Sequence, residues 1–111
     1  HEEAVKCLTK ALEIDPKYVD AWRLKAEEFH EHLHKPEEAI ECYDKAIELD
    51  PNDARVFANK AGALDDLGKY REALECIEKA KELDPSLIAG NEIIQKMIKK
   101  MKEKLDSEKK D

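Results

Sequence analysis

A histidine-rich stretch near the first third of the chain, His30-Glu31-His32-Leu33-His34, has a spacing that could do chemistry. On a helix, H-E-x-x-H points two imidazoles at one Zn²⁺ ion and leaves the glutamate as a general base. Here Lys35-Pro36 follows directly, so His34 is expected at or beyond the helix end. No third ligand is evident, although Glu27 is near. We therefore expect no enzyme, no cofactor and no resident metal, only a solvated helix end or adventitious metal binding by His30 and His34.

The three cysteines are the second set of reactive side chains. Cys7, Cys42 and Cys76 are spaced 35 and 34 residues apart, without the close C-x2-C pairing of a cysteine metal site. On stacked helices roughly 8–10 Å apart they would exceed the disulfide reach of about 7 Å between Cα atoms. An odd number of cysteines and no signal-like opening stretch predict partly buried free thiols in a cytoplasmic setting.

Charge and composition exclude two classes of partner. The formal net charge is −7, and residues 95–111 carry seven lysines against four acids, so the acidic excess lies in residues 1–94. An acidic body argues against a phosphate backbone as ligand. No apolar run approaches the roughly 18 residues of a membrane-spanning helix. We expect neither a nucleic acid nor a membrane as partner, and no Gly-rich phosphate loop or Ser/His/Asp arrangement occurs.

The elements that position these side chains repeat along the chain. Asp-Pro occurs at 15–16, 50–51 and 84–85, each time after Glu-Ile or Glu-Leu. The residues around each pair align as well. The aligned rows are Ala4, Ala39 and Ala73; Lys10, Lys45 and Lys79; Ala11, Ala46 and Ala80; and Trp22 with Phe57. A period of this size predicts stacked supersecondary units.

Each unit is predicted to hold two helices. Apolar residues fall at helical spacing in 18–33 and again in 37–49, and Pro51 ends the second stretch. Small residues, such as Ala26 facing Ala39, allow the two helices to approach closely. Gly68 can adopt the left-handed geometry that ends a helix. Its equivalent in the earlier unit is His34, with one extra residue inserted nearby, so that turn is less well specified.

These patterns resemble the tetratricopeptide repeat. The first full unit reads W-x2-K-A-x2-F from Trp22 to Phe29, then E-E-A, Y-x2-A and L-D-P, and the second reads F-x2-K-A-x2-L, L-G-K-Y-R-E-A, I-x2-A and L-D-P. The resemblance implies an all-α fold, a right-handed superhelix of antiparallel helical hairpins with a C-terminal capping helix. It implies a single domain: 1–16 as the second helix of a truncated repeat, then repeats at 17–51 and 52–85. A chain that starts within a repeat is expected to be a fragment of a longer protein.

The remaining segment is predicted to be one capping helix over 86–106, followed by a disordered tail over 107–111. Its apolar stripe consists of Leu87, Ile94, Ile98, Met101 and Leu105. A terminal unit should bury one side and expose the other to solvent, as this pattern does. Ile93 and Met97 lie beside the stripe, and they are either extra packing or an exposed contact seam.

The resemblance also implies where a ligand would bind, because the first helix of each tetratricopeptide hairpin lines a concave groove. The corresponding residues are Asp20, Arg23, Leu24, Glu27 and Glu31; then Arg55, Ala58, Asn59, Gly62 and Asp66; then Ala89, Glu92, Ile93 and Lys96. The function implied is a protein-interaction module that binds a peptide or protein segment of unknown identity. The alternative is a structural scaffold that self-associates weakly through its first helix, with Ala4, Leu8 and Ala11, or through Ile93 and Met97.

Some tetratricopeptide domains clamp the C-terminal carboxylates of the major cytosolic chaperones. That clamp takes Lys and Asn from the first groove helix, Asn from the second, and Lys and Arg from the third. In one frame this chain offers Arg23 and Glu27, then Asn59, then Ala89 and Ile93; shifted by a repeat it offers Leu24, then Arg55 and Asn59. Neither frame completes the set, so we expect no tight binding of an acidic chaperone tail.

Overall fold

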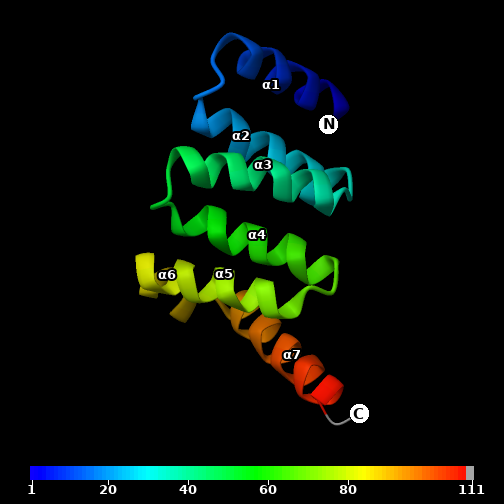
Figure 1. Cartoon of the computed structure of the whole chain (residues 1–111), viewed down its shortest axis with the longest axis vertical. Coiled ribbons are helices and arrows are strands. Elements are labelled where there is room, and N and C mark those ends of the chain that lie inside the picture. The colour runs from blue at the N-terminus through cyan, green and yellow to red at the C-terminus, as the bar shows by residue number, and fades with distance from the viewer. Residues whose placement is uncertain (110–111) are drawn as a thin grey trace.

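The structure, a computed structural model, describes residues 1–109, with side chains described through residue 107. Its helices are α1 (Glu2–Ile14), α2 (Val19–Glu27), η1 (Glu28–His32, a π-helical turn), α3 (Pro36–Leu49), α4 (Ala54–Asp66), α5 (Tyr70–Leu83), α6 (Pro85–Ala89) and α7 (Glu92–Lys109). They stack in chain order along an elongated body of 49 × 26 × 21 Å (Figure 1). The predicted all-α architecture of stacked helical hairpins is confirmed.

Two antiparallel hairpins form the centre of the stack, α2–η1 with α3 and α4 with α5. Ala26, Ala39, Ala61 and Ala73 are completely buried where the helices of each hairpin meet. Such small side chains let two helix backbones approach closely, as the sequence predicted. Larger residues fill the spaces around them, with Tyr43 buried in the first hairpin. The core is therefore a series of thin layers rather than one central cluster.

The turns between layers use the residues that the repeat pattern placed there. The Asp53 carboxylate accepts a hydrogen bond of 3.1 Å from the backbone N–H of Arg55 and so caps the start of α4. Proline occupies the first helical position of α3 and of α6, where its missing N–H costs nothing. These fixed starts set the direction of each helix relative to the previous one.

The inserted residue of the first hairpin is accommodated in η1. There the backbone winds through Glu28–His32 as a π-helix, whose wider turn holds more residues than an α-helical turn. The hairpin turn then places His34 at a φ of 54°, where the second hairpin has Gly68 at a φ of 75°. The two turns therefore share one geometry, although only one of them has the residue that favours it.

The C-terminal cap differs from the single helix predicted over 86–106. The chain forms α6, breaks at Gly90 and restarts as α7, because Asn91 caps the new helix by accepting the Ile94 N–H at 3.1 Å. The predicted tail is also wrong over 107–109, because α7 continues through Lys109. Residues 110 and 111 lie outside the described residues. The sequence feature that marks this break is an Asn directly after a Gly inside an otherwise helical pattern.

The cap buries the predicted stripe in part. Ile94 and Met101 are buried against α5, with Met101 completely inaccessible, and the other three residues of the stripe are half-buried. Ile88, which lies outside the stripe, is buried as well. The two residues beside the stripe have different environments, since Met97 packs against the core whereas Ile93 is 80% exposed. Of the two roles left open for this pair, Met97 provides packing and Ile93 is exposed.

Candidate functional site

A pocket of about 220 Å³ opens where α2, α4 and the α6–α7 break converge. Arg23 and Glu27 line it from α2. Ala58, Asn59 and Arg55 line it from α4, and Leu87, Asn91 and Ile94 complete it at the cap. A pocket for a whole small-molecule ligand is usually 300 Å³ or more, so this volume suits one or two side chains of a larger ligand.

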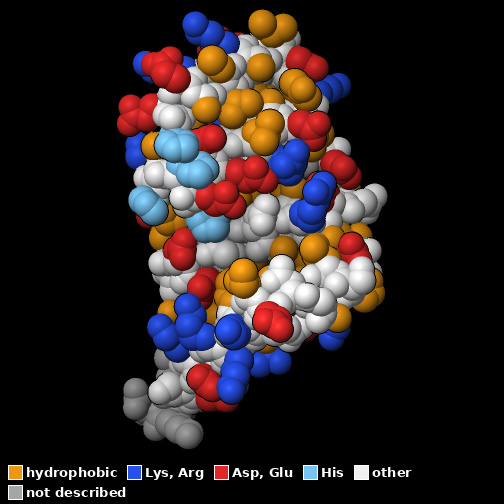
Figure 2. Space-filling model, turned by 180° about the vertical axis from the view of Figure 1, so that it is seen from behind, with side chains coloured by type: hydrophobic (Ala, Val, Ile, Leu, Met, Phe, Trp, Pro, Cys, Tyr) orange, Lys and Arg blue, Asp and Glu red, His pale blue; other side chains and the backbone are white. Residues whose placement is uncertain are grey.

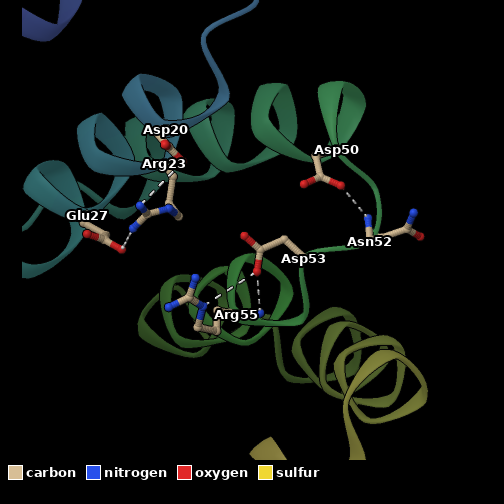
Figure 3. Close-up of polar contacts among 7 residues, drawn as sticks. All are labelled: Asp20, Arg23, Glu27, Asp50, Asn52, Asp53 and Arg55. Atoms are coloured by element: carbon tan, nitrogen blue, oxygen red, sulfur yellow. Dashed lines mark hydrogen bonds and ion pairs between the residues drawn. The ribbon is translucent and has the colours of Figure 1, made fainter.

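Arg23 is held by acids of its own helix. Its guanidinium lies 3.1 Å from the Glu27 carboxylate and 3.7 Å from that of Asp20, and its side chain is only 23% exposed (Figure 3). Both partners lie within one helical turn, at the i,i+3 and i,i+4 positions that face one another. The positive charge of Arg23 is therefore largely compensated before any ligand arrives.

Arg55 is the more available cation of the pocket. Its nearest carboxylate oxygen, on Asp53, lies 3.9 Å from Nε and also accepts the backbone N–H that caps α4. The Arg55 side chain is 70% exposed, and it points toward the space between α2 and α4 that Arg23 faces from the other side (Figure 3). An exposed and loosely paired guanidinium can bind a carboxylate in bidentate fashion.

The rest of the lining combines amides with apolar walls. The Asn59 side chain can both donate and accept hydrogen bonds, as a peptide backbone requires. Leu87 is half-buried and Ile94 is buried, and with Ala58 they give the pocket an apolar wall. The site thus offers one available cation, a backbone-binding amide and a small apolar surface.

The structure brings five of the predicted groove residues together and leaves the others outside the pocket. Arg23, Glu27, Arg55, Ala58 and Asn59 line it, and Asp20 contributes through Arg23. The remaining predicted residues do not line it: Leu24 is 42% exposed, Gly62 and Asp66 contact His30, and Glu31, Ala89, Glu92, Ile93 and Lys96 are exposed. The resemblance alone did not identify Leu87, Asn91 and Ile94, because their positions depend on the break after α6.

The H-E-x-x-H stretch does not form the one-face histidine pair that its spacing suggests. The His30 ring nitrogen Nε2 donates to the Asp66 carboxylate at 3.0 Å, across the boundary between the two hairpins. His34 lies beyond the end of η1 in the left-handed region. A Cβ added at Gly62 would lie 3.1 Å from the His30 ring, so the absence of a side chain there makes room for this imidazole. The contact joins neighbouring layers.

The cysteine thiols differ in exposure. Cys42 is buried and Cys76 half-buried, and burial raises the pKa of each thiol. Cys7 is exposed, which corrects the expectation of three partly buried thiols. The reason is local: Cys42 packs beside Trp22 and Phe29, and Cys76 beside Phe57 and Leu64, whereas no such aromatic or aliphatic cover lies over Cys7 among the described residues.

Side chains of one kind also gather on the surface. Lysine and arginine cluster at the C-terminal end of the body, over α7, and the histidines lie along one edge of the opposite half (Figure 2). Acidic and basic groups are interspersed between these two regions. The uneven charge seen in the sequence is therefore a lengthwise difference between the two ends of the stack.

Family models described as the tetratricopeptide repeat match most of the chain. One matches residues 28–53 and 54–87, and a second, with the same description, matches residues 1–18. A search of curated proteins found no match. Among the described residues, none of the helices is both long enough and apolar enough to cross a membrane.

Several solved structures of similar architecture are described as tetratricopeptide (TPR) domains. The first such domain of Spaghetti (RPAP3), bound to the HSP90 peptide SRMEEVD, superposes with a TM-score of 0.84 at 24% identity, covering 95% of this chain and 79% of that one. The second domain of human RPAP3, in complex with the HSP70 peptide SGPTIEEVD, gives 0.79 at 29% identity, covering 91% and 80%. The TPR2B domain of yeast Sti1, in a complex with pHsp70, gives 0.77 at 28% identity, covering 90% and 81%.

Proposed function

The chain belongs to the tetratricopeptide repeat family, and from this premise we propose that it is a protein-interaction module whose α2–α4–α7 pocket holds side chains of a bound peptide. The observation that carries the proposal is the lining of the pocket. It places an available guanidinium, a backbone-binding amide and an apolar wall around a space of side-chain size. The peptide complexes of the human RPAP3 and yeast Sti1 domains support the same class of ligand.

The charges of the pocket select among peptides. Arg55 favours one carboxylate, and the apolar wall of Leu87 and Ile94 favours an aliphatic side chain next to it. Asp20 and Glu27 already neutralise Arg23, and they repel a second acid that approaches α2. We propose a peptide with a single acidic residue beside an aliphatic one, rather than a run of acids.

Peptide-display selection on the immobilised chain, followed by isothermal titration, tests this proposal. Arg55→Glu is expected to lower the affinity for the selected peptides at least tenfold, and Asn59→Ala by a smaller factor. Circular dichroism should show unchanged helical content in both variants. Arg71→Glu is the matched control, because Arg71 is an exposed arginine of α5 that lies outside the pocket. Equal losses for Arg55→Glu and Arg71→Glu would place the binding site elsewhere.

The chaperone peptides named for the similar structures provide a second test. We expect SRMEEVD and SGPTIEEVD to bind this chain more weakly than low-micromolar, because Glu27 adds negative charge to the pocket and already pairs with Arg23. Fluorescence anisotropy with labelled peptides measures the affinity. Low-micromolar binding of either peptide would contradict the proposed preference for a single acid.

We propose further that the chain is not an enzyme and that it works in a reducing compartment such as the cytoplasm. Its pocket offers binding groups, while the reactive histidines are engaged elsewhere or lie on the surface. The three cysteines are free, and a reducing compartment keeps thiols in that state.

A second candidate function is weak self-association, favoured by two highly exposed isoleucines on α1 and α7. Ile93 is 80% exposed, and Ile14 at the end of α1 is 87% exposed. Burying such side chains between two copies would remove apolar surface from water. Light scattering over a range of concentrations measures the mass: a monomer at high concentration excludes this candidate, and a dimer abolished by Ile93→Lys supports it.

A further inference from the structure

Three metal-ligating side chains meet at the edge of the molecule where the histidines gather (Figure 2). They are His1, at the start of α1, and Glu28 and His32, at the two ends of η1. One ligand atom from each lies within 4.8 Å of the other two. His1 Nδ1 already donates to Glu28 Oε2 at 3.0 Å, so this pair is at the separation of two ligands on one ion.

The fold produces this cluster by packing α1 against η1. Glu28 and His32 are four residues apart, which puts them on the same face of a helix. His1 comes from 27 residues earlier, and its ring stacks on that of His32 with centroids 4.1 Å apart and planes 11° apart. Two imidazoles and a carboxylate are thus gathered from two separate elements.

We propose that His1, Glu28 and His32 bind a divalent transition-metal ion of the Zn²⁺ class, with water completing the coordination. Two imidazole nitrogens and one carboxylate oxygen form a ligand set that such ions take up, whereas Ca²⁺ and Mg²⁺ prefer oxygen alone. Zn²⁺ bonds of about 2.0–2.2 Å place tetrahedral ligand atoms roughly 3.3 Å apart. The cluster needs only a small contraction to reach this spacing.

The three side chains are free to move closer together. In-plane lone pairs of two parallel rings do not converge, so one imidazole must tilt as the ion binds. The His1 side chain is 58% exposed and His32 is also exposed, so neither ring is held by surrounding packing. For His1 Nδ1 to bind the ion, the ring proton that it shares with Glu28 moves to Nε2, so the ligand is a neutral imidazole that keeps one N–H.

The consequence for the protein is a link between α1 and the first hairpin. A ligand that binds only the folded state stabilises it in proportion to its occupancy. The bound ion holds the start of α1 to the end of η1, and none of its three ligands lines the peptide pocket. Peptide binding and metal binding are therefore separate properties of this chain, and they can be measured separately.

Isothermal titration of the metal-free chain with Zn²⁺ tests the site. We expect one ion per chain with micromolar affinity, lowered at least tenfold by His32→Ala, by His1→Ala and by Glu28→Gln. His1→Ala keeps the backbone of the first residue, so a lower affinity of this variant is due to the missing imidazole. His34→Ala is the matched control, a neighbouring exposed histidine outside the cluster, and is expected to bind as the unaltered chain does.

Two further measurements keep the result interpretable. Co²⁺ bound at this site is expected to show d–d absorption without a thiolate charge-transfer band, which excludes the three free cysteines as ligands. Zn²⁺ is expected to raise the unfolding temperature of the unaltered chain and of His34→Ala, but not of His32→Ala. No heat in the micromolar range, a thiolate band, or equal losses in His34→Ala and His32→Ala would each overturn the proposal.

Discussion

At the scale of single residues, Tyr43 shows the cost of a polar atom in a thin core. The side chain is fully buried, and its hydroxyl has no hydrogen-bond partner among the described residues. Burial, reinforced by the nearby acids Glu27 and Glu31, raises the pKa of the Tyr43 phenol well above its ordinary range. The ring contributes packing, while the hydroxyl is desolvated without compensation.

Replacing Tyr43 by phenylalanine should therefore leave the protein as stable or make it more stable by about 1 kcal/mol, because an unpaired buried hydroxyl costs roughly that much. Urea unfolding measures the free energy. Tyr70→Phe is the control, since the Tyr70 hydroxyl accepts an exposed hydrogen bond from Lys104 at 3.1 Å and its loss should leave the free energy of unfolding almost unchanged. A destabilised Tyr43→Phe variant would reveal a partner for the hydroxyl.

The cysteines should react at separate rates with a thiol reagent. Burial raises the pKa of Cys42 and Cys76, so at neutral pH fewer of these thiols are thiolates, and their reaction should quicken as the pH rises toward the raised pKa. Cys7 is exposed and should react first. Mass spectrometry of the partly modified chain identifies the order, and Cys7→Ser should remove only the fast phase. Equal rates for all three would contradict the burial described here.

At the scale of elements, the two hairpin turns have the same positive-φ geometry but different residues at that position, His34 in one and Gly68 in the other. His34 adopts a positive φ that costs an L-residue about 1–2 kcal/mol, while the equivalent Gly68 adopts it freely. His34→Gly should therefore stabilise the chain by about 1 kcal/mol and raise its unfolding temperature by a few degrees. His34→Ala, which keeps the strain, should give no such gain, and Gly68→Ala should cost about as much as His34→Gly gains. An unchanged unfolding temperature in His34→Gly would show that the turn is not strained.

The helices themselves were predictable from the sequence, because the Asp-Pro turns and the buried alanines recur at a fixed spacing. The break after α6 was missed, since Gly90 and Asn91 lie in a stretch whose apolar pattern continues on both sides. The π-helical turn was visible only as one extra residue. The pocket was predicted in part: Arg55 and Asn59 follow from their repeat position, but Ile94 lines it only because α7 restarts where it does.

The cluster of His1, Glu28 and His32 could not be predicted from spacing. The sequence drew attention to His30 and His34, which share the usual four-residue interval. The structure instead joins His32 to a histidine 31 positions earlier, through the packing of α1 on η1. Long-range contacts of this kind depend on how two elements cross, and no local pattern in this sequence records that crossing.

At the scale of the whole molecule, each layer contacts mainly its neighbours, and polar pairs bridge the layers. Lys60 pairs with Asp44 between α4 and α3 at 2.6 Å, and Lys100 pairs with Asp65 between α7 and α4 at 3.1 Å. In such an array, stability is approximately a sum of units and of the interfaces between adjacent units. Damage at one end should therefore be felt most at that end.

Met101→Ala tests this expectation, because Met101 is completely buried between the cap and α5. The truncation should cost about 2–5 kcal/mol. Hydrogen exchange should show a larger loss of protection in α5 and α7 than in α2 and α3. Met97→Ala is the milder comparison, because Met97 is only half-buried. A uniform loss of protection along the chain would mean that the stack unfolds as one unit.

Because of the π-helical turn at Glu28–His32, a repeat unit can hold one more residue without changing how the next helices stack. The 35-residue unit and the 34-residue unit therefore stack their helices in the same arrangement. The extra residue is accommodated within one turn and does not shift the helices of the next unit. A gap in any alignment of these units therefore belongs within 28–32. The same place is where the chain can tolerate a change of length without rotating everything that follows.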